Sequence, residues 1–192
     1  MFDKYSCISI LWLNVEECSF SNTIQNKRLD RDMNTITKAT EGDKEAILTL
    51  YRSFLHGAAG WSEDYPSEET IDYDLSRDAL YVMKDDSGEI LAAISIDLDE
   101  GVEALEVWSS NLTPARELSR LAVRSDLHGQ GIAKQMMRHV FGILKEQGNK
   151  SVHILVRREH KVAMTSYEHL GYKIVGECTY WDHEYVCMEI EL

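Results

Sequence analysis

The sequence predicts a single α/β domain built on a mixed central sheet of about six to seven strands, with helices on both faces. Two observations lead to this class. Short apolar runs typical of strands alternate along the chain with longer segments in which apolar residues recur every three or four positions, as they do in helices. The chain also has 192 residues, of which 44% are hydrophobic, so it can bury one sizeable core.

The first half of the chain predicts three strands and two helices. We expect strands at residues 35–38, 79–84 and 89–98, and helices at 43–56 and 67–75. Thr40 precedes the first helix and is of a residue type that caps helix N-termini. The apolar face of this helix consists of Ile47, Tyr51, Phe54 and Leu55. Asp85-Asp-Ser-Gly88 is typical of a hairpin turn between the second and third strands.

The second half predicts four strands and two helices. We expect strands at 117–123, 151–156, 173–180 and 185–192, and helices at 132–147 and 160–170. The first of these helices has one continuous apolar face, which consists of Ile132, Met136, Val140 and Leu144. Gly148 is placed to end it. Residues 57–66 and 99–114 are expected to be loops.

The turn Leu127-His-Gly-Gln-Gly-Ile-Ala133, between a strand and a helix, is suited to bind phosphate. Gly129 and Gly131 allow a positive φ and a close approach of ligand to backbone. The N–H groups of residues 131–134 open the helix as a partial positive charge. The P-loop pattern is absent, and a dinucleotide-binding turn is disfavoured because Lys134 takes the third glycine position and the next strand ends in Arg157-Arg158 rather than an acid.

The charge distribution also favours an anionic small ligand. The chain has a net charge of −13, yet residues 116–161 contain ten Lys or Arg against four acids, a local +6 that leaves −19 elsewhere. Nucleic acid would be repelled by most of the molecule. We expect Arg124, Lys134 and Arg138 to meet ligand phosphates, and Lys145 and Lys150 to be solvated surface residues.

These residues carry a resemblance to the GCN5-related N-acetyltransferases (GNAT superfamily). Residues 128–133 are similar to the Q/R-x-x-G-x-G/A turn of this superfamily, except that His128 takes the Q/R position. Residues 163–172 are similar to its A-x-x-x-Y-x-x-x-G-[FY] segment, where Tyr167 falls on the tyrosine. His160 stands where many members have asparagine. The resemblance covers residues 33–192.

The resemblance implies that acetyl-CoA binds as cosubstrate in a wedge between the central strand and its neighbour, and that its acetyl group passes directly to a primary amine. Backbone groups of the central strand would meet the pantetheine and the acetyl carbonyl, and the amides of residues 130–134 would hold the pyrophosphate. The expected cofactor-binding residues are Leu121, Ala122, Val123, Arg124, His128, Gly129, Gln130, Gly131, Ile132, Ala133, Lys134 and His160.

Tyr167 is the residue expected to donate its hydroxyl proton to the departing CoA thiolate. The resemblance implies this role, and the alternative is a core aromatic, because Ala163, Tyr167 and Leu170 share one helix face.

Glu117 is the expected general base, acting directly or through water. Burial at the start of an apolar strand would raise the pKa of its carboxyl group and favour proton uptake at neutral pH. The alternative is a solvated strand-end acid paired with Arg116 or Arg120. His128 and His160 are further titratable candidates, expected on the phosphate side, whereas Glu106 and the acids at 182–184 could face the acceptor.

Two function classes remain open at this stage, an N-acetyltransferase and a non-catalytic acyl-CoA-binding regulatory module. The expected acceptor is a small-molecule or peptide amine, and the chain could form a homodimer; we expect no nucleic-acid or membrane partner. The four cysteines, at 7, 18, 178 and 187, have neither C-x-x-C spacing nor clustering, so we expect no metal or disulfide framework and a cytoplasmic location. Residues 1–32 are expected to be an extension, either an added edge strand or lid or a segment preceding the domain.

Overall fold

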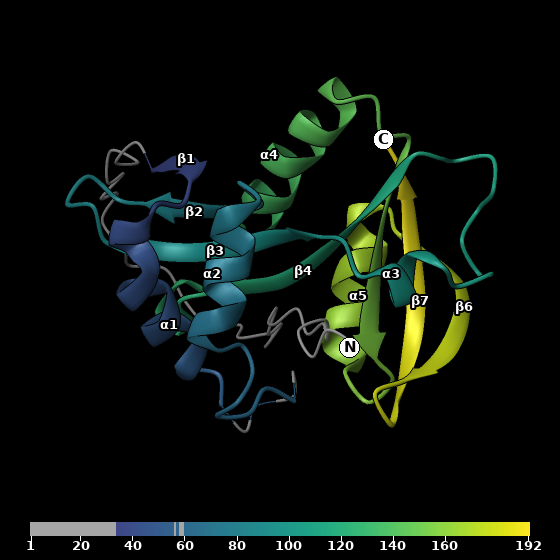
Figure 1. Cartoon of the computed structure of the whole chain (residues 1–192), viewed down its shortest axis with the longest axis horizontal. Helices are drawn as coiled ribbons and strands as arrows, with labels where there is room; N and C mark the ends of the chain where they lie inside the picture. Colours follow the sequence, from purple (N-terminus) through teal and green to yellow (C-terminus); the bar gives the residue numbers. More distant parts are fainter. Residues whose placement is uncertain (1–33, 56, 58–59) are drawn as a thin grey trace, which may run out of the picture.

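One seven-stranded sheet organises the chain, in the order β1-β2-β3-β4-β5-β7-β6 (Figure 1). The structure is a computed structural model, and it describes residues 34–55, 57 and 60–192. The strands are β1 (Thr35–Lys38), β2 (Leu80–Lys84), β3 (Ile90–Asp97), β4 (Ala115–Val123), β5 (Ser151–Arg157), β6 (Lys173–Tyr180) and β7 (His183–Glu191). Neighbouring strands are antiparallel except β4 and β5, which are parallel. The predicted mixed α/β sheet is confirmed, whereas the extension expected at residues 1–32 lies outside the described residues.

Helices cover both faces of this sheet, as predicted. The main helices are α1 (Lys44–Arg52), α2 (Glu68–Ser76), α4 (Ile132–Glu146) and α5 (Lys161–Leu170). Alternate residues of β2 separate the two layers: Leu80 and Val82 pack with α1 and α2, whereas Tyr81 and Met83 pack with α4. Tyr172 joins α4 to α5 on that second face, because its ring contacts both Phe141 and Tyr167.

The first helix is shorter than predicted. A 3-10 turn, η1 (Glu41–Asp43), precedes it, and Asp43 accepts hydrogen bonds from the backbone N–H and the hydroxyl of Thr40, both at 2.9 Å. The helix ends at Arg52 rather than residue 56, because the Ser53 hydroxyl bonds back to the Leu50 carbonyl at 2.6 Å and the chain continues in turns. Three of the four predicted core residues of this helix are buried, whereas Leu55 is half-buried.

The segment predicted as a loop at 99–114 contains a short helix, α3 (Glu100–Glu103). Asp99 begins it, because its Oδ1 accepts hydrogen bonds from the N–H groups of Gly101 at 2.6 Å and Val102 at 3.1 Å. The Tyr180 hydroxyl donates to the same oxygen at 2.9 Å, which ties α3 to the end of β6. The prediction missed this helix because one turn is too short to show an apolar period.

The two parallel strands at the centre of the sheet are paired only at their first residues. Their register covers Ala115, Arg116 and Glu117 of β4, opposite Ser151, Val152 and His153 of β5. Beyond that point β4 continues to pair with β3 up to Val123, and β5 continues to pair with β7 up to Arg157. The strands therefore separate in mid-sheet (Figure 1), and the backbone of each that faces the other has no partner among the described strands.

Candidate active site

The outer half of β4 directs backbone groups into the space between the separated strands. The N–H of Arg124 donates to the carbonyl of Leu91 on β3 at 2.9 Å. Because successive peptide groups of a strand alternate in direction, the N–H and carbonyl of Val123 point the other way, toward β5. The side chains of Leu121, Ala122 and Val123 are buried in the two helical layers. By the same alternation the N–H and carbonyl of Ala122 face β3, so only the backbone of Leu121 and the N–H of Val123 are left for a ligand in the wedge.

A β-bulge interrupts β4 within this half. Ser119 pairs with Ser95 and Ala122 with Ala93, so two residues of β4, Arg120 and Leu121, face the single residue between on β3. Arg120 adopts a φ of 51°, in the left-handed region that favours glycine. Its side chain is 1% exposed. The sequence pattern gave no sign of this bulge, because the apolar run reads as a regular strand.

Arg120 is the centre of a buried ion-pair network that holds the bulge. Its guanidinium contacts Asp74 of α2 at 2.8 Å and Asp97 of β3 at 2.7 Å, and it donates to the Tyr65 hydroxyl at 3.0 Å. Burial acts to raise the pKa of Asp97, but the Arg120 guanidinium holds that pKa below its usual value. The network connects α2, β3 and β4 around the strand that lines the wedge.

The glycine turn has the predicted conformation at the outer end of the wedge. Gly129 and Gly131 have φ of 76° and 79°, and a Cβ on either would meet no atom within 4 Å, so the turn is open on its outer side. Gly131 caps α4, and the N–H of Gln135 donates to its carbonyl at 3.1 Å. The N–H groups of residues 131–134 therefore have no acceptor within the helix. That of Gln130 instead donates to the Leu127 carbonyl at 3.3 Å.

The three predicted phosphate-binding side chains differ in their partners. Arg124 is paired with Asp126 at 2.7 Å and with Glu89 at 3.2 Å. Lys134 and Arg138 are exposed on the first turns of α4, and neither forms an ion pair with any residue that the structure describes. Lys134 and Arg138 can therefore meet an anion without leaving another partner, whereas Arg124 would first have to release two carboxylates.

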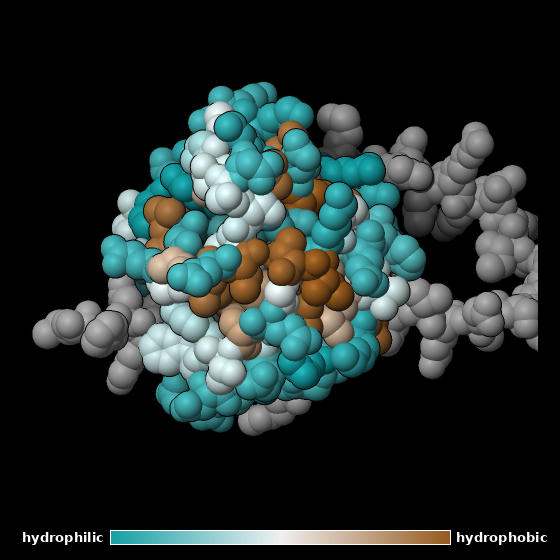
Figure 2. Space-filling view, turned by 90° about the vertical axis from the view of Figure 1, so that its right-hand side faces the viewer, coloured by the Kyte–Doolittle hydropathy of each residue, from teal (hydrophilic) through white to brown (hydrophobic). Residues whose placement is uncertain are grey.

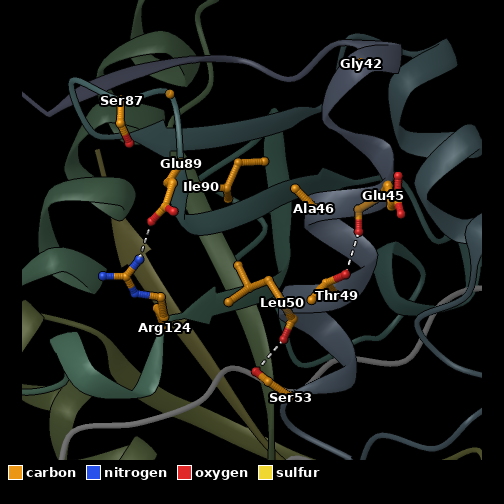
Figure 3. Close-up of a pocket in the computed structure, with 11 residues that line it drawn as sticks. Gly42, Glu45, Ala46, Thr49, Leu50, Ser53, Ser87, Glu89, Ile90 and Arg124 are labelled. Atoms are coloured by element: carbon orange, nitrogen blue, oxygen red, sulfur yellow. Dashed lines mark hydrogen bonds and ion pairs between the residues drawn. The ribbon is translucent and has the colours of Figure 1, made fainter.

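Arg124 also borders a hollow of about 680 Å³ between α1 and the β2–β3 hairpin (Figure 3). Leu50 and Ile90 provide its apolar lining, and the ion pair of Arg124 with Glu89 closes one side. The hollow lies on the α1 face of the sheet, and it is distinct from the space between β4 and β5.

His128 reinforces the end of β4. Its Nε2 lies 2.8 Å from the carbonyl of Val123, and its ring stacks at 6.2 Å on Phe54, just beyond α1. The residue that takes the Q/R position of the turn thus fixes the strand end on which the turn begins.

Glu117 lies at the point where β4 and β5 separate, and it is completely buried. Neither carboxylate oxygen has a hydrogen-bond partner in the described part of the chain. Arg116 donates to the Ala115 carbonyl, and Arg120 is held by the two aspartates. The alternative of a solvated acid paired with an arginine is therefore wrong. Burial, and secondly the nearby Asp97, raises the pKa of Glu117 well above its usual value.

His153 is a candidate that the sequence reading missed. It stands opposite Glu117 on β5, fully buried, and its ring stacks on Trp108 at a centroid distance of 4.3 Å. Its Nε2 lies 3.3 Å from Oε1 of Glu103 on α3. The sequence shows this histidine only as one polar residue in an apolar strand, so its neighbours appear only when the sheet is assembled.

Tyr167 lies in the core, 4% exposed, with its ring 5.7 Å from that of Tyr172. Burial raises the pKa of its hydroxyl well above the usual value, which keeps the phenol protonated. His160 begins the same helix, because its Nδ1 accepts a hydrogen bond from the N–H of Ala163 at 3.2 Å. Its Nε2 is buried without a partner among the described residues, and burial lowers its pKa, which favours the neutral ring.

The remaining expectations concern acids, metals and cysteines. Glu106 and the acids at 182–184 are exposed. In the described ranges, no three His, Cys, Asp or Glu side chains gather as metal ligands would, and no helix is long and apolar enough to cross a membrane. Cys178 and Cys187 are free thiols whose sulfurs lie 3.6 Å apart on β6 and β7, so these two do cluster, contrary to their sequence spacing.

Known proteins share this fold. A solved acetyltransferase of the GNAT family from Streptococcus agalactiae 2603 has a TM-score of 0.70 and 17% identity, over 83% of this chain and 95% of that one. A phosphinothricin acetyltransferase from Sinorhizobium meliloti in complex with acetyl-CoA has a TM-score of 0.65 and 19% identity, over 83% of this chain and 88% of that one. The ribosomal-protein-S18-alanine N-acetyltransferase from Escherichia coli has a TM-score of 0.62 and 18% identity, over 83% of this chain and 94% of that one.

At these identities the solved structures show the shared fold alone. No curated protein sequence matches the chain. The sequence profile described as "Acetyltransferase (GNAT) family", however, matches residues 45–172, more than half of the chain. That range contains the separating strands, the glycine turn and the helix of Tyr167. The chain therefore belongs to the acetyltransferase (GNAT) family, and it is an acetyl-CoA-dependent acetyltransferase.

Proposed function

We propose that the protein moves the acetyl group of acetyl-CoA directly to a primary amine. The observation that carries this proposal is the separation of β4 and β5 immediately after Glu117. A buried carboxyl group with no hydrogen-bond partner in the described part of the chain lies at the inner end of the resulting wedge, and the glycine turn that opens α4 lies at its outer end. A thioester ligand that extends along β4 would reach both.

The residues of the wedge suit the parts of such a ligand. The free N–H groups of residues 131–134 and the unpaired side chains of Lys134 and Arg138 would hold the pyrophosphate. The backbone N–H groups of Leu121 and Val123 would bind the pantetheine and polarise the thioester carbonyl. His128 would fix the strand end between these two parts, and the unpartnered Nε2 of His160 would accept or donate one further hydrogen bond.

Two side chains would move protons. Glu117, as its carboxylate, would accept a proton from the amine, so that the neutral nitrogen can attack the thioester carbon. Tyr167 would donate its phenolic proton to the sulfur as the carbon–sulfur bond breaks. A raised pKa suits a group that must take up a proton near neutral pH.

The acceptor is a small-molecule or peptide amine in this proposal. It would approach from the side of the α1–α2 connection and the β6–β7 turn, where exposed acids at 182–184 would attract a cation. CoA release measured with a panel of polyamines, amino acids and N-terminal peptides tests the proposal. Release with at least one amine supports it. Tight acetyl-CoA binding without release would instead favour a non-catalytic acyl-CoA-binding module.

We also propose a homodimer in the cytoplasm. β6 is an edge strand that exposes Ile174 to 53%, and Figure 2 shows apolar surface on the side of the molecule where β6 and α3 lie. Sedimentation velocity would detect the dimer, and Ile174→Lys should then shift it to monomer.

The cytoplasm is the proposed location of the protein, because the sequence lacks the cysteine pattern of a disulfide framework.

A further inference from the structure

Five buried polar atoms that form no hydrogen bond with any described residue gather beside the inner end of the wedge. They are Oε1 and Oε2 of Glu117, Nδ1 and Nε2 of His153 and Oε1 of Glu103. Buried polar atoms in folded proteins nearly always have partners, so a group of five calls for an explanation. All three side chains can bind and release a proton, and together they extend from the wedge to the surface.

The order of the three residues follows from the register and the contacts. Glu117 and His153 are directly opposite on neighbouring parallel strands, so their side chains project from the same face of the sheet. His153 Nε2 lies 3.3 Å from Glu103, which leaves Nδ1 for Glu117. Because neither Nδ1 nor a Glu117 oxygen has a hydrogen-bond partner among the described residues, this link would run through one water. The side chain of Glu103 is 29% exposed, whereas that of His153 is fully buried.

The Trp108 ring covers one face of the His153 imidazole and holds it in place. Trp108 stacks on it with an interplanar angle of 19°, and the Trp108 indole N–H donates to the Val102 carbonyl at 2.7 Å. Val102 belongs to α3, next to Glu103, so one short helix both anchors the Trp108 ring over the imidazole and supplies the carboxylate beside it. This arrangement gives the imidazole a fixed orientation.

We propose that His153 is a positioning residue that carries the proton of the acceptor amine from Glu117 toward Glu103 and solvent. This inference rests on the proposed acetyl transfer. The proposed cycle starts with one proton on the Glu117 carboxyl group, which a single water would connect to the imidazole. When this proton moves to the imidazole, Glu117 becomes a carboxylate and the imidazolium is stabilised by Glu103. Glu117 then takes one proton from the ammonium substrate, and the imidazolium releases one through Glu103, so the pair regains its starting state.

The other charged groups around this pair are already occupied. Asp97 on β3, beside Glu117, is held by Arg120 of β4 at 2.7 Å. Glu189 on β7, beside His153, accepts from the Ser109 N–H at 3.1 Å and from the Ser151 hydroxyl at 2.8 Å. Asp99 caps α3. Among the described residues, Glu103 is thus the carboxylate beside the imidazole whose Oε1 still lacks a hydrogen-bond partner.

His153→Asn and His153→Gln test the relay, because each keeps one hydrogen-bonding position of the ring and cannot titrate. We expect kcat to fall about 10²-fold with little change in acetyl-CoA affinity. The rise of kcat with pH should move to higher pH, because Glu117 would keep its proton longer. His139→Gln, on α4 against Tyr81, is the matched control. A wild-type pH profile in both His153 variants, with Glu117→Gln inactive, would overturn the relay and leave the proposed function intact.

Glu103→Gln gives a second reading if the histidine variants do not fold. This variant should also lower kcat, but by less than the His153 variants do. Glu100→Gln changes an exposed residue of the same helix and should leave kcat unchanged. If Glu103→Gln and Glu100→Gln are both as active as the wild type, Glu103 is not the group through which the proton leaves. Full activity of Glu117→Gln would overturn the relay and the base role together, while amine-dependent CoA release would still establish acetyl transfer.

Discussion

Glu117 and His153 form the last rung at which β4 and β5 are paired, and both side chains are fully buried there. Beyond this rung the two strands follow different neighbours, β3 and β7. The carboxyl group of Glu117 and the imidazole of His153 therefore stand opposite each other in the register where the sheet opens. A ligand held along β4 would end against them, and this relationship links the fold to the chemistry proposed for it.

Gly131→Asp should abolish acetyl-CoA binding while the domain stays folded. The φ of 79° disfavours any side chain, and the carboxylate would lie at the N–H groups that hold phosphate. Isothermal titration calorimetry measures the loss. Gly142→Asp places the same residue on the exposed side of α4 and should bind normally. Undiminished affinity in a folded Gly131 variant would contradict the phosphate-binding role of the turn.

Removal of the charges of Lys134 and Arg138 should weaken CoA more than pantetheine, which has no phosphates. Each lost charge-assisted hydrogen bond should lower affinity about 10-fold. Arg124→Gln should cost less, because Asp126 and Glu89 already hold that guanidinium. Lys145→Gln, in the last turn of α4, is the control. Competition binding separates the ligands, and equal losses for CoA and pantetheine would assign these residues to the solvated surface.

Tyr167→Phe should fold normally and bind acetyl-CoA nearly as well, while kcat falls toward the lower end of the ~10²- to 10⁴-fold range of general acid catalysis. The thiolate of CoA is a tolerable leaving group, with a thiol pKa of about 8.5, so the phenol only assists its departure. Steady-state kinetics and thermal melts check this. Tyr172→Phe is the control, because its hydroxyl is buried without a described partner. A Tyr167 variant with full kcat and a lowered melting temperature would make this tyrosine a core residue only.

Glu117→Gln should stabilise the protein increasingly as pH rises. The pKa of Glu117 is raised in the folded state, so the wild type loses stability from the unfolded value of 4.5 upward, until the folded carboxyl group ionises. The amide has no such loss. Melting temperatures of both proteins from pH 4 to 9, beside those of the exposed Glu146→Gln, measure the effect. A constant difference across that range would mean that the carboxyl group ionises normally.

Arg120→Ala should destabilise the fold by about 3–5 kcal/mol, because it removes the buried guanidinium between Asp74 and Asp97 and leaves Arg77, at 2.8 and 3.5 Å, to face two buried carboxylates. Urea unfolding measures this loss. Arg116→Ala removes an arginine of the same strand that donates only to the adjacent Ala115 carbonyl, and it should change stability little. A loss below about 1 kcal/mol for Arg120→Ala would mean that water or a rearranged bulge replaces the guanidinium.

The sequence by itself determined the features that depend on neighbours along the chain. The turn from Leu127 to Ala133 requires glycine at two positions of positive φ, and the apolar period of α4 begins immediately after it. The hairpin at 85–88 and the alternation of strands and helices are local in the same way. The boundaries were less certain: α1 ends four residues early, and the single turn of α3 was missed.

Only the tertiary structure decided which side chains meet. His153 lies 36 positions after Glu117 in the numbering, yet the parallel register places them opposite each other. Arg120, which the sequence offered as a partner for Glu117, turns instead to Asp74 and Asp97 because the bulge gives it a φ of 51°. Burial then raises the pKa of Glu117. Such contacts depend on strand order and register, which are set by packing over the whole core rather than by residues adjacent in the chain.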